Sequence, residues 1–315
     1  MPIAHGLFVQ GLPDSIMVRI AHLTDPHLPL AGVKLSELFS KRILGFLSWT
    51  LKRHRRHRPA CLEKVLADMR AAAADHIVLT GDVVNISTRA EFAAAEDWLA
   101  RLGGPETLML VPGNHDHYVA DAKRAGLERL HPWMAGSDSQ VAPGTFPFVR
   151  YVRNVAIIGL DSTYPAPWTE ASGRLGEDQL NRLARMLADC REKGLFRLVL
   201  VHHPPLFELA SKPRKALKDA DSLAAVLRRE GAEAVLFGHN HWWAHETLES
   251  ATGPVHLLGG PSASMTPEQN HRPPAGWQML EIGRQRGRWL LTVERRELGS
   301  DGRMHTRERL VLHEG

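Results

Sequence analysis

Five short apolar segments, each followed within three residues by aspartate, asparagine or histidine, constrain the fold of this chain more than any other feature. The segments are rich in aliphatic and β-branched residues and alternate with helical patterns, which predicts strands in a layered α/β fold. They cover residues 17–22, 76–80, 107–111, 198–201 and 234–237. Further strands are predicted at 155–160, 255–258 and 277–282, and helices at 62–73, 90–101 and 177–193.

Polar residues stand just beyond the carboxyl end of each of the five strands. Ligands of open α/β sheets bind beyond that edge, so loops far apart in the sequence would converge on one site. Taken singly, an Asp-x-His or a Gly-Asp after a strand is usually a turn, and a lone histidine is usually structural. The prediction of a site therefore rests on the ordered set of these residues.

The ordered set resembles the signature of the calcineurin-like metallophosphoesterases. Its members are Asp-x-His at 25–27, Gly-Asp at 81–82, Gly-Asn-His-Asp at 113–116, His at 202 and Gly-His-Asn-His at 238–241. The similarity covers roughly residues 19–242. It implies a four-layer αββα sandwich, two mixed sheets flanked by helices, and a hydrolase of phosphoric esters that uses two divalent metal ions.

The resemblance also implies roles for individual residues. Asp82 would bridge the two metal ions, because one carboxylate offsets the repulsion of cations roughly 3.5–4 Å apart. The other expected ligands are Asp25, His27 and His241 for the first metal, and Asn114, His202 and His239 for the second. The glycines at 81, 113 and 238 would allow the tight turns that point these side chains inward. Mixed imidazole and oxygen ligands suit manganese, iron, zinc or cobalt, and we expect manganese or iron.

The family chemistry assigns His115 the role of general acid. A hydroxide bridging the two metals would attack phosphorus in line, and His115 would protonate the leaving oxygen. We expect Asp116 to orient His115 and to raise its pKa by pairing with it. The alternative for His115 is a hydrogen-bonding residue beside the metals. Three more histidines, His22, His117 and His203, are expected to support the loops or to be solvated.

Departures from other branches of the family narrow the choice. Ser/Thr protein phosphatases continue Gly-Asp into a segment that ends in Arg-Gly, whereas Val-Val-Asn-Ile-Ser follows Asp82 here. Purple acid phosphatases carry a tyrosine three residues after that aspartate, where this chain has Asn85, which excludes an iron–phenolate centre. The remaining pattern is similar to the bacterial phosphodiesterases, whose substrates are cyclic nucleotides, glycerophosphodiesters and other small diesters.

An insertion before the helix at 62–73 sets this chain apart from the small cyclic-nucleotide enzymes. Apolar residues follow one another at helical spacing through 35–58, namely Leu35, Leu38, Phe39, Ile43, Phe46, Leu47 and Leu51, with Trp49 beside them. Such a helix can lie in a membrane interface with its basic residues on anionic headgroups. The insertion is similar in character to that of a chlamydial-type UDP-2,3-diacylglucosamine pyrophosphatase of lipid A synthesis. A membrane-peripheral pyrophosphatase acting on a nucleotide-lipid is therefore the alternative function.

Seven basic residues of this insertion also dominate the net charge. No acidic residue lies between 38 and 62, and without these seven the net charge of +4 would be negative. The chain therefore has no evenly basic surface, and no specific nucleic-acid partner is expected. The insertion could instead pack on the protein as a lid or contact nucleic acid without specificity. Outside enzymes the alternative is a catalytically inactive scaffold, and a nuclease would need a further basic face.

Length and composition bound the remaining features. We expect an N-terminal extension at 1–16 and one domain at 17–315 with the basic insertion at about 34–60, and Met17 is an alternative start to Met1. Cys61 and Cys190 are too few for a disulfide framework, which indicates a reducing compartment. The expected location is cytoplasmic, either free or peripheral on the inner face of the membrane. The proline-rich stretch 261–274 is predicted to be a surface loop and the closing segment an edge hairpin, while the sequence leaves the oligomeric state and the substrate open.

Overall fold

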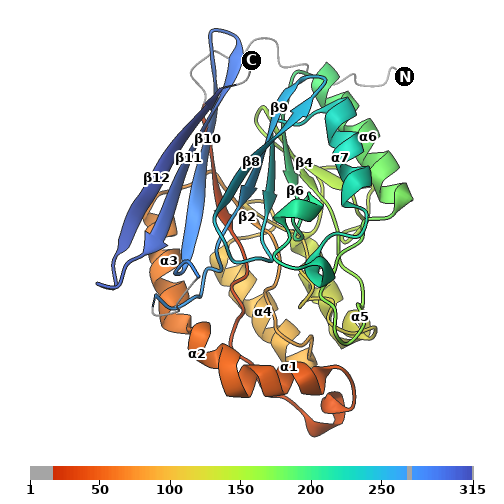
Figure 1. The fold of residues 1–315 in the computed structure, drawn as a ribbon, viewed down its shortest axis with the longest axis vertical. Helices are drawn as coiled ribbons and strands as arrows, with labels where there is room; N and C mark the ends of the chain where they lie inside the picture. Colours follow the sequence, from red (N-terminus) through yellow and green to blue (C-terminus); the bar gives the residue numbers. More distant parts are fainter. Residues whose placement is uncertain (1–16, 268–271, 314–315) are drawn as a thin grey trace, which may run out of the picture.

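Two mixed β-sheets lie face to face between layers of helices in the computed structural model, which describes residues 17–267 and 272–313 (Figure 1). The predicted extension at 1–16 lies outside the described residues. The first sheet has the order β12-β11-β10-β1-β2-β3, with β1 (Val18–Leu23), β2 (His76–Leu79), β3 (Leu108–Leu110), β10 (Gly276–Gln285), β11 (Arg288–Leu298) and β12 (Met304–His313). The second has the order β4-β5-β6-β7-β9-β8, with β4 (Phe148–Val152), β5 (Val155–Gly159), β6 (Phe196–Leu200), β7 (Ala234–Phe237), β8 (Ala244–Ser250) and β9 (Gly253–Gly259).

Parallel strands form one half of the first sheet, including its edge strand β3, and the centre of the second sheet, and antiparallel strands complete both. β1, β2 and β3 run parallel, as do β5, β6, β7 and β9. Residues of β6 alternate between two cores: Leu198 and Leu200 belong to the core that includes β1, and Val199 to the core under α6 and α7. A strand buried on both faces has no polar side, which explains the continuous apolar runs in the sequence.

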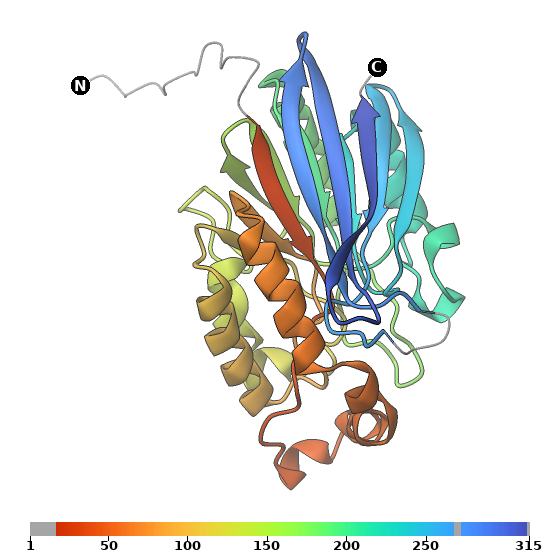
Figure 2. The ribbon, with the colours of Figure 1, turned by 90° about the vertical axis from the view of Figure 1, so that its left-hand side faces the viewer.

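Helices cover the outer face of each sheet. α3 (Pro59–Ala71) and α4 (Arg89–Leu102) contribute to the core of the first sheet, and α6 (Glu177–Glu192) and α7 (Ala220–Glu230) to that of the second. The predicted four-layer sandwich is therefore confirmed, and Figure 2 shows the same layers from the side. Short helices complete the set: α5 (Ala122–Ala125), η3 (Leu127–Trp133), η4 (Phe207–Leu209) and η5 (Pro213–Lys215). Among the described helices, none is long and apolar enough to cross a membrane.

All of the predicted strands form, with ends that differ by a few residues. The sequence did not predict β4 and β8, which lie at the two edges of the second sheet. Their sequences mix polar and apolar residues, as expected for strands with a partly exposed face. The predicted closing hairpin is confirmed as β11 and β12, and β12 is the edge strand of the first sheet.

The insertion is not the single helix that the sequence predicted. It consists of η1 (Leu35–Leu38), α1 (Arg42–Ser48), a π-helical turn η2 (Trp49–Arg53) and α2 (His54–Arg56), which lie at one end of the molecule in both views. Lys41 and Arg42 interrupt the expected surface helix because they are buried and bind the protein body. Lys41 donates to the carbonyl of Ala166 (3.0 Å), and Arg42 to the carbonyls of Ile86 and Ser87 (3.0 and 2.8 Å).

The proline-rich stretch was also predicted wrongly in its first half. Residues 261–266 are buried, and they pack beside the end of β1 instead of forming a surface loop. Ala263 donates its backbone N–H to the carbonyl of Thr24 (3.0 Å), and the Ser262 hydroxyl donates to the carbonyl of Asp25 (2.7 Å). Small residues that hydrogen-bond a loop can be buried in spite of their polarity.

Candidate metal centre

Loops at the carboxyl ends of β1, β2, β3, β6 and β7 meet at one buried point, where the structure brings all seven predicted ligands together. The first group comes from β1 and β7. Nε2 of His241 lies 3.1 Å from Oδ1 of Asp25 and 3.3 Å from Nε2 of His27. Nε2 of His27 is in turn 3.9 Å from Oδ1 of Asp25.

A second group comes from β3, β6 and β7. Nε2 of His202 lies 3.2 Å from Oδ1 of Asn114 and 3.2 Å from Nδ1 of His239. Nδ1 of His202 donates to the carbonyl of Thr80 (2.7 Å), which leaves a lone pair on Nε2. That lone pair faces the carbonyl oxygen of Asn114.

Asp82 lies between the two groups. Its Oδ2 is 3.8 Å from Nε2 of His27, and its Oδ1 is 3.5 Å from Nε2 of His202. Oδ1 of Asp82, Oδ1 of Asn114 and Nε2 of His202 thus lie close together, and all three are atoms that can bind a cation. The nitrogen and oxygen donors present therefore fit first-row divalent metal ions at both groups.

The pKa values of the two carboxylates, Asp82 and Asp25, shift in opposite directions. Burial raises the pKa of Asp82 well above its ordinary value, and the charge of Asp25 adds to the effect. Burial also acts to raise the pKa of Asp25, but the charge and hydrogen bond of His241 outweigh it and lower that pKa. Burial lowers the pKa of His27 and of His239, so both imidazoles are neutral. A neutral imidazole is the form that binds metals.

Strained backbone concentrates at these positions. Five of the seven predicted ligands have left-handed φ angles: Asp25 (51°), His27 (42°), Asp82 (57°), His239 (67°) and His241 (58°). Non-glycine residues in this region cost about 1–3 kcal/mol each and cluster at functional sites. Gly81 (φ 87°) adds a close approach, because a Cβ there would lie 2.5 Å from the backbone nitrogen of Gly113.

His115 lies beside the metal groups, but Asp116 does not orient it, so that prediction was wrong. Nδ1 of His115 instead donates to the carbonyl of Asn85 (2.5 Å). The Asp116 carboxylate accepts from the backbone N–H groups of Asp82 (2.9 Å), Gly113 (2.8 Å) and Val84 (3.0 Å). These three N–H groups occupy the carboxylate, which therefore links the loop after β2 to the loop after β3 and does not bind the imidazole of His115. Burial, and next the charge of Arg53, lower the pKa of His115, whereas we expected it to be raised.

Histidines outside the predicted ligand set hold the surrounding loops. His203 is bound by the Ser162 hydroxyl (2.8 Å) and the carbonyl of Ala171 (3.2 Å). His22 contacts the Thr80 hydroxyl (2.8 Å), at the end of β2. These contacts agree with the supporting roles expected from the sequence.

Comparison with known proteins identifies the family. The model of the calcineurin-like phosphoesterases matches residues 18–243, which is more than half of the chain. The chain belongs to this family. It is a metallophosphoesterase, and its clusters of histidine and aspartate suit the dinuclear centre of divalent metals on which the family depends.

Curated relatives of this phosphoesterase are phosphodiesterases. A probable cyclic nucleotide phosphodiesterase of Synechococcus sp. is 29% identical over 220 residues, which cover 69% of this chain and 76% of the relative. The glycerophosphodiester phosphodiesterase GpdQ of Enterobacter lignolyticus is 28% identical over 223 residues, which cover 67% of this chain and 73% of the relative. These relatives agree with the bacterial branch indicated by the sequence.

Solved structures share the fold of this phosphoesterase. A dimetal phosphatase from Danio rerio has a TM-score of 0.61 at 15% identity, covering 95% of this chain and 99% of its own. A purple acid phosphatase of yellow lupin has a TM-score of 0.60 at 13% identity, covering 96% of this chain and 55% of its own. At these identities the likeness is one of fold alone.

The insertion of this phosphoesterase sends Arg53 into the site, which the sequence did not predict. Nη2 of Arg53 lies 3.1 Å from both ring nitrogens of His27, and Nη1 lies 3.1 and 3.3 Å from those of His115. A donor equally distant from both nitrogens lies over the ring and not along a lone pair. Among the described residues, Arg53 forms no ion pair, so its guanidinium keeps donors for an anion.

Two more cations, Arg272 and Lys215, lie near the metal groups. Nη1 of Arg272 is 3.2 Å from Nδ1 of His241. Burial lowers the pKa of Lys215, as does the charge of Arg272, while the charges of Asp25 and Asp82 raise it. No motif of the sequence marked Arg53, Lys215 or Arg272, because each is an ordinary basic residue in a loop or basic run.

Proposed function

We propose that this metallophosphoesterase hydrolyses phosphodiesters at two divalent metal ions held by the seven predicted residues. These are Asp25, His27 and His241 in the first group, Asn114, His202 and His239 in the second, and Asp82 between them. The position of Asp82 carries the proposal, because each of its carboxylate oxygens faces one group. Bound metal ions would supply positive charge to the phosphoryl oxygens and acidify the attacking water. Manganese or iron is the preferred pair for this mixture of imidazole and oxygen ligands.

His115 is the proposed general acid. Its Nδ1 is held by the carbonyl of Asn85, so Nε2 is the atom that can deliver a proton to a leaving oxygen. Burial and the charge of Arg53 keep its pKa low in the free protein. A phosphoryl anion on Arg53 would offset that charge and favour the protonated imidazole when substrate is bound.

Arg53, Lys215 and Arg272 are the proposed binding groups for the substrate anion. Guanidinium groups bind phosphoryl oxygens through two parallel hydrogen bonds, and Arg53 has donors that no carboxylate in the described part of the chain engages. The three cations add positive charge to the metal ions and leave the site electropositive. This arrangement favours a phosphoester whose phosphoryl group is negatively charged.

A small diester is the first candidate substrate. The names of the curated relatives support a cyclic nucleotide or a glycerophosphodiester. The metal groups are buried, so the loops around the site would determine which of these two substrates is bound. For this candidate the insertion serves as a packed lid that carries Arg53.

A nucleotide-lipid is the second candidate, and one observation favours it. The insertion, whose Arg53 reaches the site, exposes a row of apolar side chains: Leu35 (80% exposed), Phe39 (92%), Ile43 (42%), Leu44 (44%), Leu47 (47%) and Leu51 (66%). Exposed rows of this kind mark interaction surfaces. In this candidate the enzyme is peripheral on the cytoplasmic face of a membrane and cleaves a pyrophosphate such as that of UDP-2,3-diacylglucosamine.

A side-by-side assay tests the proposal. The purified protein would be supplied with Mn²⁺ and offered bis-p-nitrophenyl phosphate, cyclic AMP, a glycerophosphodiester and UDP-2,3-diacylglucosamine in mixed micelles. We expect hydrolysis of the generic diester that stops on chelation and returns with metal. Turnover that persists without metal, or that is absent from all four substrates, contradicts the proposal. The relative kcat/KM values separate the two candidate substrates.

A further inference from the structure

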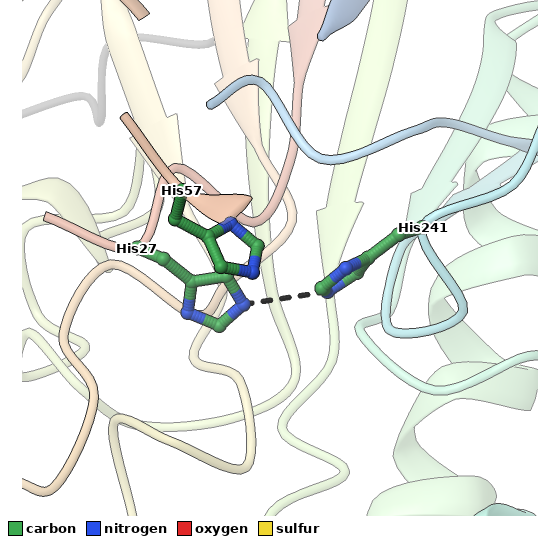
Figure 3. A group of neighbouring side chains, drawn as sticks. All are labelled: His27, His57 and His241. Atoms are coloured by element: carbon green, nitrogen blue, oxygen red, sulfur yellow. Dashed lines mark hydrogen bonds between the residues drawn. The ribbon is translucent and has the colours of Figure 1, made fainter. Parts of the chain in front are cut away.

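The end of the insertion places a third imidazole against the first metal group. The ring centroid of His57 lies 4.5 Å from that of His27 and 5.4 Å from that of His241. A coordinating atom of each of these three histidines lies within 4.8 Å of the others. Figure 3 shows one ring nitrogen of His57 directed toward the space between His27 and His241. His57 is only 4% exposed, so solvent does not account for this orientation.

Backbone pairing fixes His57 at this position. His57 forms an antiparallel β-bridge with Met265, far along the chain. On one side Arg58 donates its N–H to the carbonyl of Ser264 (2.9 Å), and on the other Thr266 donates to the carbonyl of Arg56 (2.8 Å). The backbone of His57 is thus held by this bridge and by its own N–H, which donates to the carbonyl of Arg53 (2.9 Å) at the end of the insertion. Precise support of this kind is what a metal ligand requires.

A chain of hydroxyls determines which ring nitrogen of His57 carries the proton. The carbonyl of Asp25 can only accept, so the Ser262 hydroxyl donates to it (2.7 Å). With its hydrogen committed, the Ser262 oxygen accepts from its neighbours, the Ser264 hydroxyl (3.3 Å) and Nδ1 of His57 (3.2 Å). Nδ1 also lies 2.9 Å from the Ser264 hydroxyl. Nδ1 is therefore the protonated donor, and Nε2 keeps a lone pair.

From this geometry we propose that Nε2 of His57 is an additional ligand of the metal ion at Asp25, His27 and His241. A metal-bound histidine almost always donates its other N–H to an oxygen acceptor, and Ser264 and Ser262 provide it for His57. The inference rests on the proposed metal centre. It also links the insertion to the centre, since His57 ends the segment that begins with the exposed apolar row.

An additional imidazole has a consequence for metal choice. With His57 the first metal group contains three imidazoles and the carboxylates of Asp25 and Asp82. Imidazole favours iron, cobalt, nickel and zinc, whereas carboxylates and water suit manganese and magnesium. His57 therefore increases the preference of this position for cobalt or iron over manganese. His57 does not change the metal preference of the other position, at Asn114, His202 and His239.

Cobalt and manganese binding to metal-free protein tests the assignment without any assay of activity. Wild type, His57→Gln and His54→Gln would be titrated with each metal, and the Co²⁺ absorption bands recorded. His54 is a matched control, because it is an exposed histidine of the same insertion and bonds the carbonyl of Trp49 (2.9 Å). Ser264→Ala is a milder variant that removes one of the two hydroxyls that accept from Nδ1 and leaves that of Ser262.

We expect His57→Gln to lower the Co²⁺ affinity of one of two sites by roughly 10-fold or more, with a smaller loss for Mn²⁺ and a changed spectrum. Ser264→Ala should change both in the same direction to a smaller extent, and His54→Gln should match wild type. Thermal unfolding of the metal-free proteins shows whether the variants fold alike. If wild type binds two cobalt ions and His57→Gln binds them with the same affinity and spectrum, the assignment of His57 as a ligand is overturned, but the proposed metal centre is not. Wild type that binds no cobalt overturns the proposed metal centre as well.

Discussion

The residues proposed to bind metal are held by unfavourable local conformations. Left-handed φ angles at Asp25, His27 and Asp82, and at both histidines after β7, cost folding free energy that the surrounding contacts must offset. Backbone bonds between the loops do this directly. Asp25 donates to the carbonyl of Gly81 and His27 to the carbonyl of Asp82, each at 3.1 Å. The loops therefore hold their side chains in place before any ligand binds.

Replacement of His115 tests its role as general acid. We expect His115→Ala to lower kcat by roughly 10²–10⁴-fold for a diester with a poor leaving group, because that oxygen must be protonated as it departs. For p-nitrophenolate, which leaves as a stable anion, the loss should be much smaller. Metal content measured alongside should stay near that of wild type. Equal losses for the two substrates argue against proton donation.

Replacement of Arg53 tests the proposed anion-binding group. Arg53→Gln should lower kcat/KM by roughly 10–100-fold, because a charge-assisted hydrogen bond to the phosphoryl group is lost. Removal of a cation from the site should leave metal affinity unchanged or increase it. Arg55→Gln, at the exposed position two residues away, is the control. A fall in metal affinity in Arg53→Gln would show that Arg53 acts through the metal ligands and not on substrate.

His76 connects stability to pH at a position away from the metal groups. It is buried in β2, and burial together with the charge of Arg150 lowers its pKa to about 4. The unfolded chain takes up a proton near pH 6.5 that the folded protein excludes, so stability is lost as the pH falls from 6.5 toward 4. We expect the free energy of unfolding, measured by urea denaturation of chelated protein, to fall between pH 7 and pH 5 by about 2 kcal/mol less in His76→Gln than in wild type. Parallel curves for the two proteins exclude His76 as the cause.

At the scale of elements, the insertion divides its basic residues among three tasks. Lys41 and Arg42 attach it to the protein body, and Arg53 lies over His27 and His115. The remaining four, Lys52, Arg55, Arg56 and Arg58, are exposed. Gly45 allows α1 to lie close to the body, because a Cβ there would be 2.4 Å from Ile86. This packing turns the apolar row outward.

Binding to vesicles tests whether this outward row meets a membrane. Each exposed cation near an anionic surface contributes about 1 kcal/mol, in addition to burial of Phe39, Leu47 and Leu51. Replacement of Lys52, Arg55, Arg56 and Arg58 by Gln should therefore release the protein from anionic vesicles while hydrolysis of a soluble diester continues. Replacement of four exposed arginines of α6 and α7 is the charge-matched control: Arg185, Arg191, Arg228 and Arg229. Wild type that fails to sediment with anionic vesicles at low salt contradicts the membrane candidate and leaves the insertion as a lid.

At the scale of the whole molecule, the sequence predicts the layers and the seven candidate ligands because the ligands lie just beyond buried strands, in an order that resembles the family signature. Local composition identifies the strands, and the sheets bring the carboxyl ends of these strands together. His57 has no such signal, since its position depends on a bridge to Met265 that no local pattern encodes. Asp116 was assigned to the wrong partner for a similar reason. Its neighbour in sequence is His115, but its carboxylate accepts from the amides of Asp82 and Val84, in the loop after β2.

Trp49 illustrates the same difference between local pattern and tertiary contact. Its place in an amphipathic segment predicted a membrane-facing aromatic, yet the structure buries it. The π-helical turn that begins at Trp49 rotates the following residues, and Arg53 then enters the site. Helical spacing identifies the apolar residues of the insertion, whereas packing against the body decides which of them stay exposed.

The central claim is a dinuclear metal centre in which Asp82 bridges the two ions. The most direct measurement is the metal content of wild type and Asp82→Ala, together with turnover of bis-p-nitrophenyl phosphate. We expect about two ions per chain in wild type, and in Asp82→Ala the loss of at least one ion and of turnover, because two cations would repel each other without the bridge. Asp82→Ala that keeps both ions and its activity, or wild type that is fully active after chelation, contradicts the claim.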